Sequence, residues 1–189
     1  RIVVMKDGVV QQVDTPQNLY QKPGNLFVAG FMGSPQMNFL DAQIAEKGGD
    51  LVAKVGEYDV VIPAAKAKVL KDGGYVGKTV VLGIRPEDIH DSQMFIEASP
   101  SVPMTSTVKV YELLGAEVFL YFDVNGTQVT ARVDPRTNSK QAIQSNSHFD
   151  MEKSSLLRQR DRACYLQLIF RRMKLGLRGF PLGLFCVIL

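Results

Sequence analysis

Short apolar and alternating segments, separated by turn residues, dominate the middle of the chain. They are Met37–Ile44, Leu51–Val55, Tyr58–Ile62, Thr79–Ile84, Thr107–Leu113, Glu117–Val124 and Thr127–Val133. Asn125-Gly126 lies between the last two, and Asn-Gly between β-rich segments is a strong hairpin signal. Many short strands with frequent turns predict a mainly β fold, built as a small β-barrel or β-sandwich.

The first 34 residues have a different pattern. Ile2–Met5 and Val9–Val13 predict a β-hairpin around Asp7-Gly8, because Gly adopts positive φ without a steric penalty. "DTPQNLYQKP" and "NLFVAGFMG" predict two short helices, the first capped by Asp14 or Thr15. This part is too small to bury a core alone. Gly33-Ser34-Pro35 then interrupts the apolar pattern, which indicates a domain junction.

Two segments of the middle part are not strand-like. "PAAKAKVLKDGG" predicts a helical turn or a loop, and "SQMFIEASPSVPM" predicts a loop because of its prolines and serines.

The charge of the chain is unevenly distributed. The formal net charge is +3, but residues 1–140 contain 14 Lys+Arg and 16 Asp+Glu, a net of −2. Residues 141–189 contain 8 Lys+Arg and 3 Asp+Glu, a net of +5, together with both cysteines, Cys164 and Cys186. The acidic body gives no electrostatic reason to expect a nucleic-acid partner. It also has no cysteine for a disulfide or a thiolate metal site.

Catalytic motifs are absent from the sequence. There is no G-x-x-x-x-G-K-[ST] phosphate loop and no G-x-G-x-x-G after a strand, and His90 and His148 are the only histidines. "RPEDIHD" at Arg85–Asp91 is the densest polar cluster, a candidate for acid–base or metal chemistry. We interpret it instead as a solvated loop, with Arg85 and Glu87 paired across a turn set by Pro86. "YELLGAEVFLYF" has the aromatics of a base-stacking platform, but we expect them to be divided between the core and the outer face.

The order and spacing of several motifs resemble one known family. "RIVVMKDG", "TP..LY..P", "FVAGFMGSP.MNFL" and "LGIRPE" resemble the ATP-binding subunits of ABC sugar importers, the maltose and multiple-sugar type above all. The resemblance extends from Arg1 to Lys140. It implies that residues 1–34 form the end of an α/β ATPase domain. Residues 35–140 would form an OB-like regulatory (TOBE) domain, and that domain would be incomplete.

The resemblance also implies roles for particular residues. Matching the family's junction are Gly33, Ser34, Pro35, Met37, Asn38 and Phe39, and matching its motif strand are Arg85, Pro86 and Glu87. We expect structural and regulatory roles for them, with no catalytic, cofactor-binding or metal-binding residue in this chain. The family's phosphate loop, signature motif, catalytic glutamate and switch histidine would lie upstream of Arg1, so ATP and Mg are expected cofactors of the parent protein.

Residues 141–189 depart from the family except at "DMEK", Asp150–Lys153. "QAIQSNSHF" can be encoded so that a one-base shift reads Gly-Asp-Ser-Ile-Lys-Leu-Ala-Leu, a natural final strand. "SSLLRQRDR" can be encoded so that a shift reads Val-His-Phe-Phe-Asp-Lys-Glu-Thr. We therefore interpret this tail as frameshifted, which would leave the barrel without its last strands. The alternative is a genuine extension or an amphipathic membrane-surface tail.

The sequence therefore predicts a fragment of an importer ATP-binding subunit without ATPase activity of its own. The resemblance implies as partners a second ATPase subunit, membrane permease subunits and regulatory proteins, at the cytoplasmic face of the cell membrane. One alternative is a stand-alone β-barrel domain that binds a small ligand or an oxyanion. Another is a regulatory fragment that competes for the dimer interface of the intact subunit.

Overall fold

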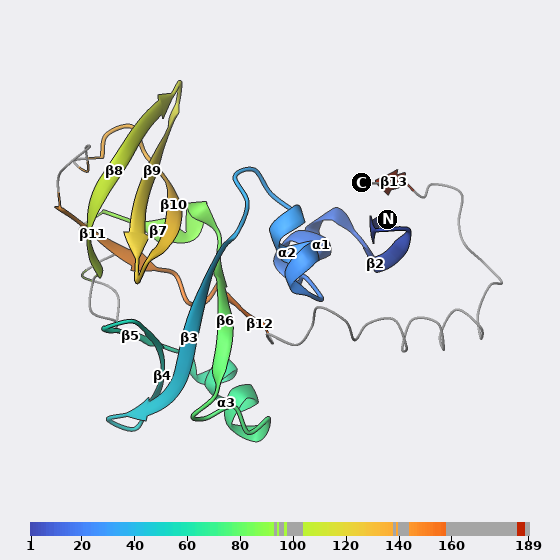
Figure 1. Ribbon diagram of the computed structural model, residues 1–189, viewed down its shortest axis with the longest axis horizontal. Coiled ribbons are helices and arrows are strands. Elements are labelled where there is room, and N and C mark those ends of the chain that lie inside the picture. Colours follow the sequence, from blue (N-terminus) through green and yellow to red (C-terminus); the bar gives the residue numbers. More distant parts are fainter. Residues whose placement is uncertain are drawn as a thin grey trace. The chain divides into compact units, whose positions relative to one another are not determined.

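The computed structural model describes residues 1–92, 94, 97, 104–137, 139, 144–157 and 185–187. The chain divides into two compact units, and the boundary between them lies between Gln36 and Met37. One unit contains residues 1–36 and strand β13 (Phe185–Val187), and the other contains residues 37–156 (Figure 1).

The first unit is a hairpin followed by two short helices. Strands β1 (Ile2–Lys6) and β2 (Val9–Asp14) pair antiparallel, and β13 pairs parallel with β1. Thr15 caps helix α1 (Pro16–Gln21), and Asn25 caps helix α2 (Leu26–Phe31). Both caps satisfy backbone N–H groups that a helix start leaves unpaired. The predicted hairpin and helices are therefore present, around a small core of Val4, Leu19 and Val28.

The second unit consists of two five-stranded sheets. The first has the order β12-β6-β3-β4-β5, with β3 (Asn38–Lys47) and β6 (Thr79–Ile84) side by side (Figure 1). Its other strands are β4 (Asp50–Val55), β5 (Tyr58–Val61) and β12 (Ser155–Leu157). The second sheet has the order β10-β9-β8-β11-β7. Its strands are β7 (Ile89–His90), β8 (Met104–Leu114), β9 (Glu117–Val124), β10 (Thr127–Val133) and β11 (Gln144–Phe149).

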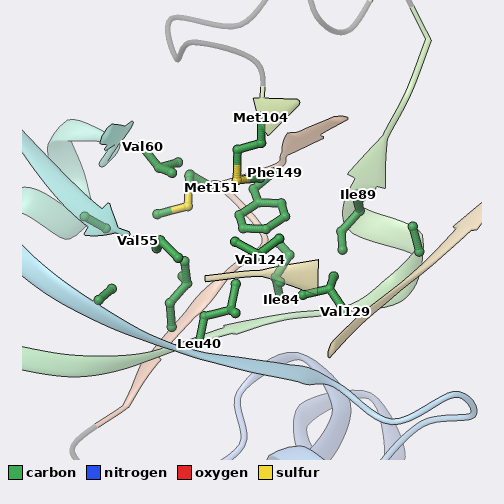
Figure 2. Close-up of a cluster of buried hydrophobic side chains, with 14 of the residues drawn as sticks. Leu40, Val55, Val60, Ile84, Ile89, Met104, Val124, Val129, Phe149 and Met151 are labelled. Atoms are coloured by element: carbon green, nitrogen blue, oxygen red, sulfur yellow. The ribbon is translucent and has the colours of Figure 1, made fainter. Parts of the chain in front are cut away.

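One hydrophobic core lies between the two sheets. Figure 2 shows side chains of Leu40, Val55, Val60 and Ile84 from the first sheet together with Met104, Val124, Val129 and Phe149 from the second. Met151, which follows β11, is part of the same cluster. Alternate residues of each strand point into this core, as the period of two predicts. The mainly β, OB-like fold class is therefore confirmed.

The segment predicted as a helical turn or a loop is helix α3 (Ala64–Asp72). Leu70 is buried and Ala67 packs against the core, so α3 covers part of the first sheet. Most of the predicted loop at residues 92–104 lies outside the described residues.

The end of the second unit differs from our expectation. We expected the barrel to lack its last strands, but β11 pairs with β8 and with β7, and β12 lies beside β6. The backbone ladder of a strand does not depend on side-chain identity, and Phe149, which is 1% exposed, supplies apolar volume at the core. A strand therefore forms here even though its sequence is polar.

Ser147 is a described position at which the polar sequence of β11 is costly. It is 4% exposed, and its hydroxyl has no hydrogen-bond partner among the described residues. A buried hydroxyl without a partner loses its hydrogen bonds to water and forms none in the protein, which lowers the stability of the fold. The shifted reading of this segment places Leu at the same position.

We predict that Ser147→Ala raises the free energy of unfolding by about 1 kcal/mol, because it removes an unsatisfied buried hydroxyl. Ser154→Ala is the matched comparison, since the Ser154 hydroxyl is also buried but donates to the Met151 carbonyl at 2.9 Å. Ser154→Ala should lower the free energy of unfolding by a similar amount. Urea unfolding of both variants measures the difference, and a loss of stability in Ser147→Ala contradicts the prediction.

Candidate functional site

The structure pairs Asn38 and Phe39, the last residues of the junction, with the strand that leads into the "LGIRPE" motif. The first residues of β3 pair with the last residues of β6, so that Asn38 lies opposite Ile84 and Phe39 opposite Gly83. Arg85, Pro86 and Glu87 follow directly, with Pro86–Asp88 forming the 3-10 helix η1. The end of the junction and the "LGIRPE" motif therefore lie on neighbouring paired strands, although they are distant in sequence.

Gly33, Ser34 and Pro35 lie before the boundary of the two units, and Met37 lies after it. Gly33 has a φ of 131°, which side chains rarely tolerate, and the Ser34–Pro35 peptide bond is cis. Met37 is 5% exposed. Its sulfur lies 2.5 Å from where a Cβ on Gly83 would be, so a side chain at position 83 would collide with it. Gly83 thus allows the junction strand to approach β6 closely.

Asn38 connects the two sheets through its side chain. Its Nδ2 donates to the Thr130 carbonyl at 2.8 Å and to the Ile84 carbonyl at 3.2 Å, and its Oδ1 accepts from the Thr130 N–H at 2.8 Å. Thr130 belongs to β10, the outer strand of the second sheet. The side-chain amide has the same donor and acceptor as a peptide group, so Asn38 pairs with β10 as an additional strand residue would.

The motif residues after β6 are more buried than we expected. Arg85 is 4% exposed and Asp88 is 5% exposed, so the interpretation of "RPEDIHD" as a solvated loop is wrong. Burial lowers the pKa of the Arg85 guanidinium, and the nearby Asp88 carboxylate opposes this effect. The reason for the burial is that β7 continues from η1 and pairs with β11, which brings the cluster inside the unit.

The "DMEK" turn closes over this cluster. The Asp150 N–H donates to the Asp88 carbonyl at 2.9 Å, and the Lys153 ammonium lies 3.4 Å from a carboxylate oxygen of both Asp88 and Asp150. Burial lowers the pKa of the His90 imidazole, Asp150 opposes this, and Lys153 lowers it further. Asp88 and Asp91 oppose the lowering more weakly. These contacts join the "DMEK" turn to η1.

Other candidate chemistry can be placed as well. No group of three or more His, Cys, Asp or Glu residues with metal-ligand geometry occurs in the part of the chain that the structure describes. Phe122 is in the core and Tyr111 packs against it. Cross-strand pairing with Glu112 and Arg132 puts Phe119 on the opposite face of the hairpin, so the expected division of the aromatics is present. Among the described residues, no helix has the length and hydrophobicity needed to cross a membrane.

Local sequence patterns did not predict the contacts of two residues in this unit, Asn38 and Lys66. Asn38 was named through the resemblance alone, and nothing in its neighbourhood in sequence indicates a partner 92 residues away. Lys66 was not singled out at all. Its ammonium contacts the carbonyls of the "DMEK" turn, and a lone lysine in a polar helix gives no sequence signal for such a role.

Comparisons with known proteins agree with this arrangement. Residues 33–89, which include β3 to β6, η1 and the start of β7, match the MalK OB fold domain. The chain is 41% identical over 153 residues to the oligosaccharides import ATP-binding protein MsmX of Bacillus subtilis, which is 81% of this chain and 41% of that protein. It is 46% identical over 129 residues to the multiple sugar-binding transport ATP-binding protein MsmK of Streptococcus mutans, 68% of this chain and 33% of that protein.

A third relative is the trehalose/maltose import ATP-binding protein MalK of Thermococcus litoralis, which is 38% identical over 154 residues, 81% of this chain and 41% of that protein. The chain thus spans about two fifths or less of the length of these relatives. The predicted resemblance to sugar-import ATP-binding subunits is confirmed, and the chain carries the MalK-type OB domain.

We predict that Asn38→Ala lowers the free energy of unfolding by about 2 kcal/mol or more, because the Thr130 N–H and carbonyl both lose their partner. Gln43→Ala is the matched control, since Gln43 is an exposed amide on the same strand. It should change stability by less than about 0.5 kcal/mol. Equal losses in the two variants, measured by urea unfolding, would show that the bridge does not contribute.

We predict that His90 titrates below the ordinary histidine pKa of about 6.5. A lowered folded-state pKa means that the unfolded chain takes up the proton first. His90 therefore contributes a loss of stability as the pH falls from 6.5 towards the folded-state pKa. In a His148→Gln variant, His90 is the only histidine, so its imidazole NMR signals report this titration directly. A midpoint at or above the value in the unfolded chain contradicts the prediction.

Proposed function

We propose that this chain, which carries a MalK-type OB domain and is related along most of its length to sugar-import ATP-binding proteins, is part of the ATP-binding subunit of an ABC sugar importer. In this proposal the whole subunit couples ATP hydrolysis to carbohydrate uptake. The OB-like unit is its regulatory and dimerisation domain, and residues 1–34 are the end of its ATPase domain.

The match of residues 33–89 to the MalK OB fold domain is the observation that carries the proposal. It includes the junction strand with Asn38 and the motif strand with Arg85, the two segments that the structure joins. Met37, Asn38, Arg85 and Pro86 are buried, which supports a structural role for them in the OB-like unit. Gly33, Ser34, Pro35, Phe39 and Glu87 are exposed or partly buried, and for them the proposed role rests on the family match of residues 33–89.

The nucleotide chemistry belongs to a part of the subunit that these residues do not form. A P-loop holds phosphates through backbone N–H groups and a lysine and positions Mg²⁺ through its Ser or Thr, and this sequence has no such motif. ATP and Mg²⁺ would therefore bind to the ATPase domain of the parent protein. The proposed partners are a second ATP-binding subunit, the permease subunits and regulatory proteins, at the cytoplasmic face of the membrane.

A chimera tests the proposal in Bacillus subtilis. This chain would replace the segment that it matches in MsmX, in a strain without the native protein, and uptake of a radiolabelled oligosaccharide would be measured. We expect uptake to return, and a MsmX from which the same segment is simply deleted should not restore it. Equal uptake with the deletion would contradict a regulatory or dimerisation role, and no uptake with a stably produced chimera would contradict the family assignment.

We also predict that the isolated chain does not hydrolyse ATP, because it lacks the phosphate loop. Phosphate release from ATP and Mg²⁺ should equal the blank at every protein concentration tested. Release that rises in proportion to the concentration of the purified chain would contradict this part of the proposal.

A further inference from the structure

The ammonium of Lys66 is surrounded by backbone carbonyls of one turn. Nζ lies 2.6 Å from the Met151 oxygen, 2.8 Å from the Glu152 oxygen and 2.6 Å from the Ser154 oxygen. A lysine ammonium has three N–H donors and no acceptor, so donors and carbonyls match one to one. Lys66 comes from α3, and the turn lies 85 or more residues further along the chain.

Burial lowers the pKa of the Lys66 ammonium, and the nearby carboxylates of Glu152, Asp150 and Asp88 oppose this lowering. Asp88 and Asp150 also contact Lys153, whose ammonium lies on the other side of the turn. Ser154 adds an internal contact, because its hydroxyl donates to the Met151 carbonyl. Lys66 from α3 and Asp88 from η1 are thus the two residues outside the turn that contact residues 150–154 through these groups.

The turn leads directly into β12, the outer strand of the first sheet. β12 has three residues and is the neighbour of β6. Five of the six residues of β6 are buried, so β6 would present an apolar edge with free N–H and carbonyl groups without β12. A three-residue strand offers few ladder bonds of its own, and its position therefore depends on the turn that precedes it.

We propose that Lys66 is a latch that fixes the 150–154 turn and thereby keeps β12 on the edge of β6. When the latch is released, the carbonyls of Met151, Glu152 and Ser154 lose their donor at once, and the contacts to Met151 and Ser154 are partly buried. The turn and β12 then open locally, while the rest of the OB-like unit keeps its core. The last segment of the unit is in this way a strap that depends on the Lys66 side chain, and its opening exposes the β6 edge.

Hydrogen exchange of the full chain, read by mass spectrometry, tests the latch. We expect Lys66→Met to speed exchange in residues 150–157 and in β6 on the order of tenfold, with β8, β9 and β10 unchanged. Lys68→Met is the matched control, since Lys68 is exposed on the same helix, and it should exchange like the unsubstituted chain. Unchanged exchange in Lys66→Met, or an equal increase in all strands, would overturn the proposal.

A second measurement covers the case in which Lys66→Met does not fold. In Lys66→Ala, ethylammonium should occupy the vacated ring of carbonyls and restore protection of residues 150–157. Tetramethylammonium at the same ionic strength should not, because it has no N–H to donate. Restoration by ethylammonium alone supports the latch, and equal effects of the two cations, or none from either, would overturn it.

Discussion

The pairing of the Asn38 side chain with the backbone of Thr130 is the interaction on which the OB-like unit depends. β10 is the outer strand of its sheet, and an outer strand leaves N–H and carbonyl groups in need of partners. Asn38 supplies one donor and one acceptor to Thr130 and a further donor contact to Ile84. One residue thereby joins the edge of the second sheet to the first sheet, and the core between the sheets is closed at that edge.

The end of the unit is held by charge rather than by apolar packing alone. Lys66, which belongs to α3, donates to carbonyls of the 150–154 turn. Lys153 belongs to the turn, and its ammonium contacts the Asp88 carboxylate, while the Asp88 carbonyl accepts from the Asp150 N–H. Most of these groups are only partly buried, where ion pairs are weakly stabilising and responsive to their surroundings. The closure at the terminal turn is therefore weaker than the closure at Asn38.

Much of the fold could be predicted from the sequence because its signals are local. The alternation of Leu40, Ala42 and Ile44 places them on the core face of β3, and Asn125-Gly126 gives the turn between β9 and β10. Thr15 and Asn25 cap helices at the predicted starts. The prediction failed where burial comes from a distant segment. Arg85 and Asp88 look solvated in sequence, and they are buried because β7 pairs with β11. For the same reason β11 itself was not expected, since its polar residues form a strand through pairing with β8 and β7.

The sequence by itself determined strands β3 to β6 and β8 to β10, the hairpin and helices before Gly33, and the resemblance to sugar-import ATP-binding subunits. These depend on side-chain periodicity, turn residues and motif order, which a linear chain displays. Only the tertiary structure decided that the junction and the "LGIRPE" motif form one feature, that Asn38 bridges two sheets, and that Lys66 holds the terminal turn. Each of these depends on hydrogen bonds between groups far apart in the sequence, such as Asn38 and Ile84, and their partners are fixed by the packing of the sheets, which no local pattern encodes.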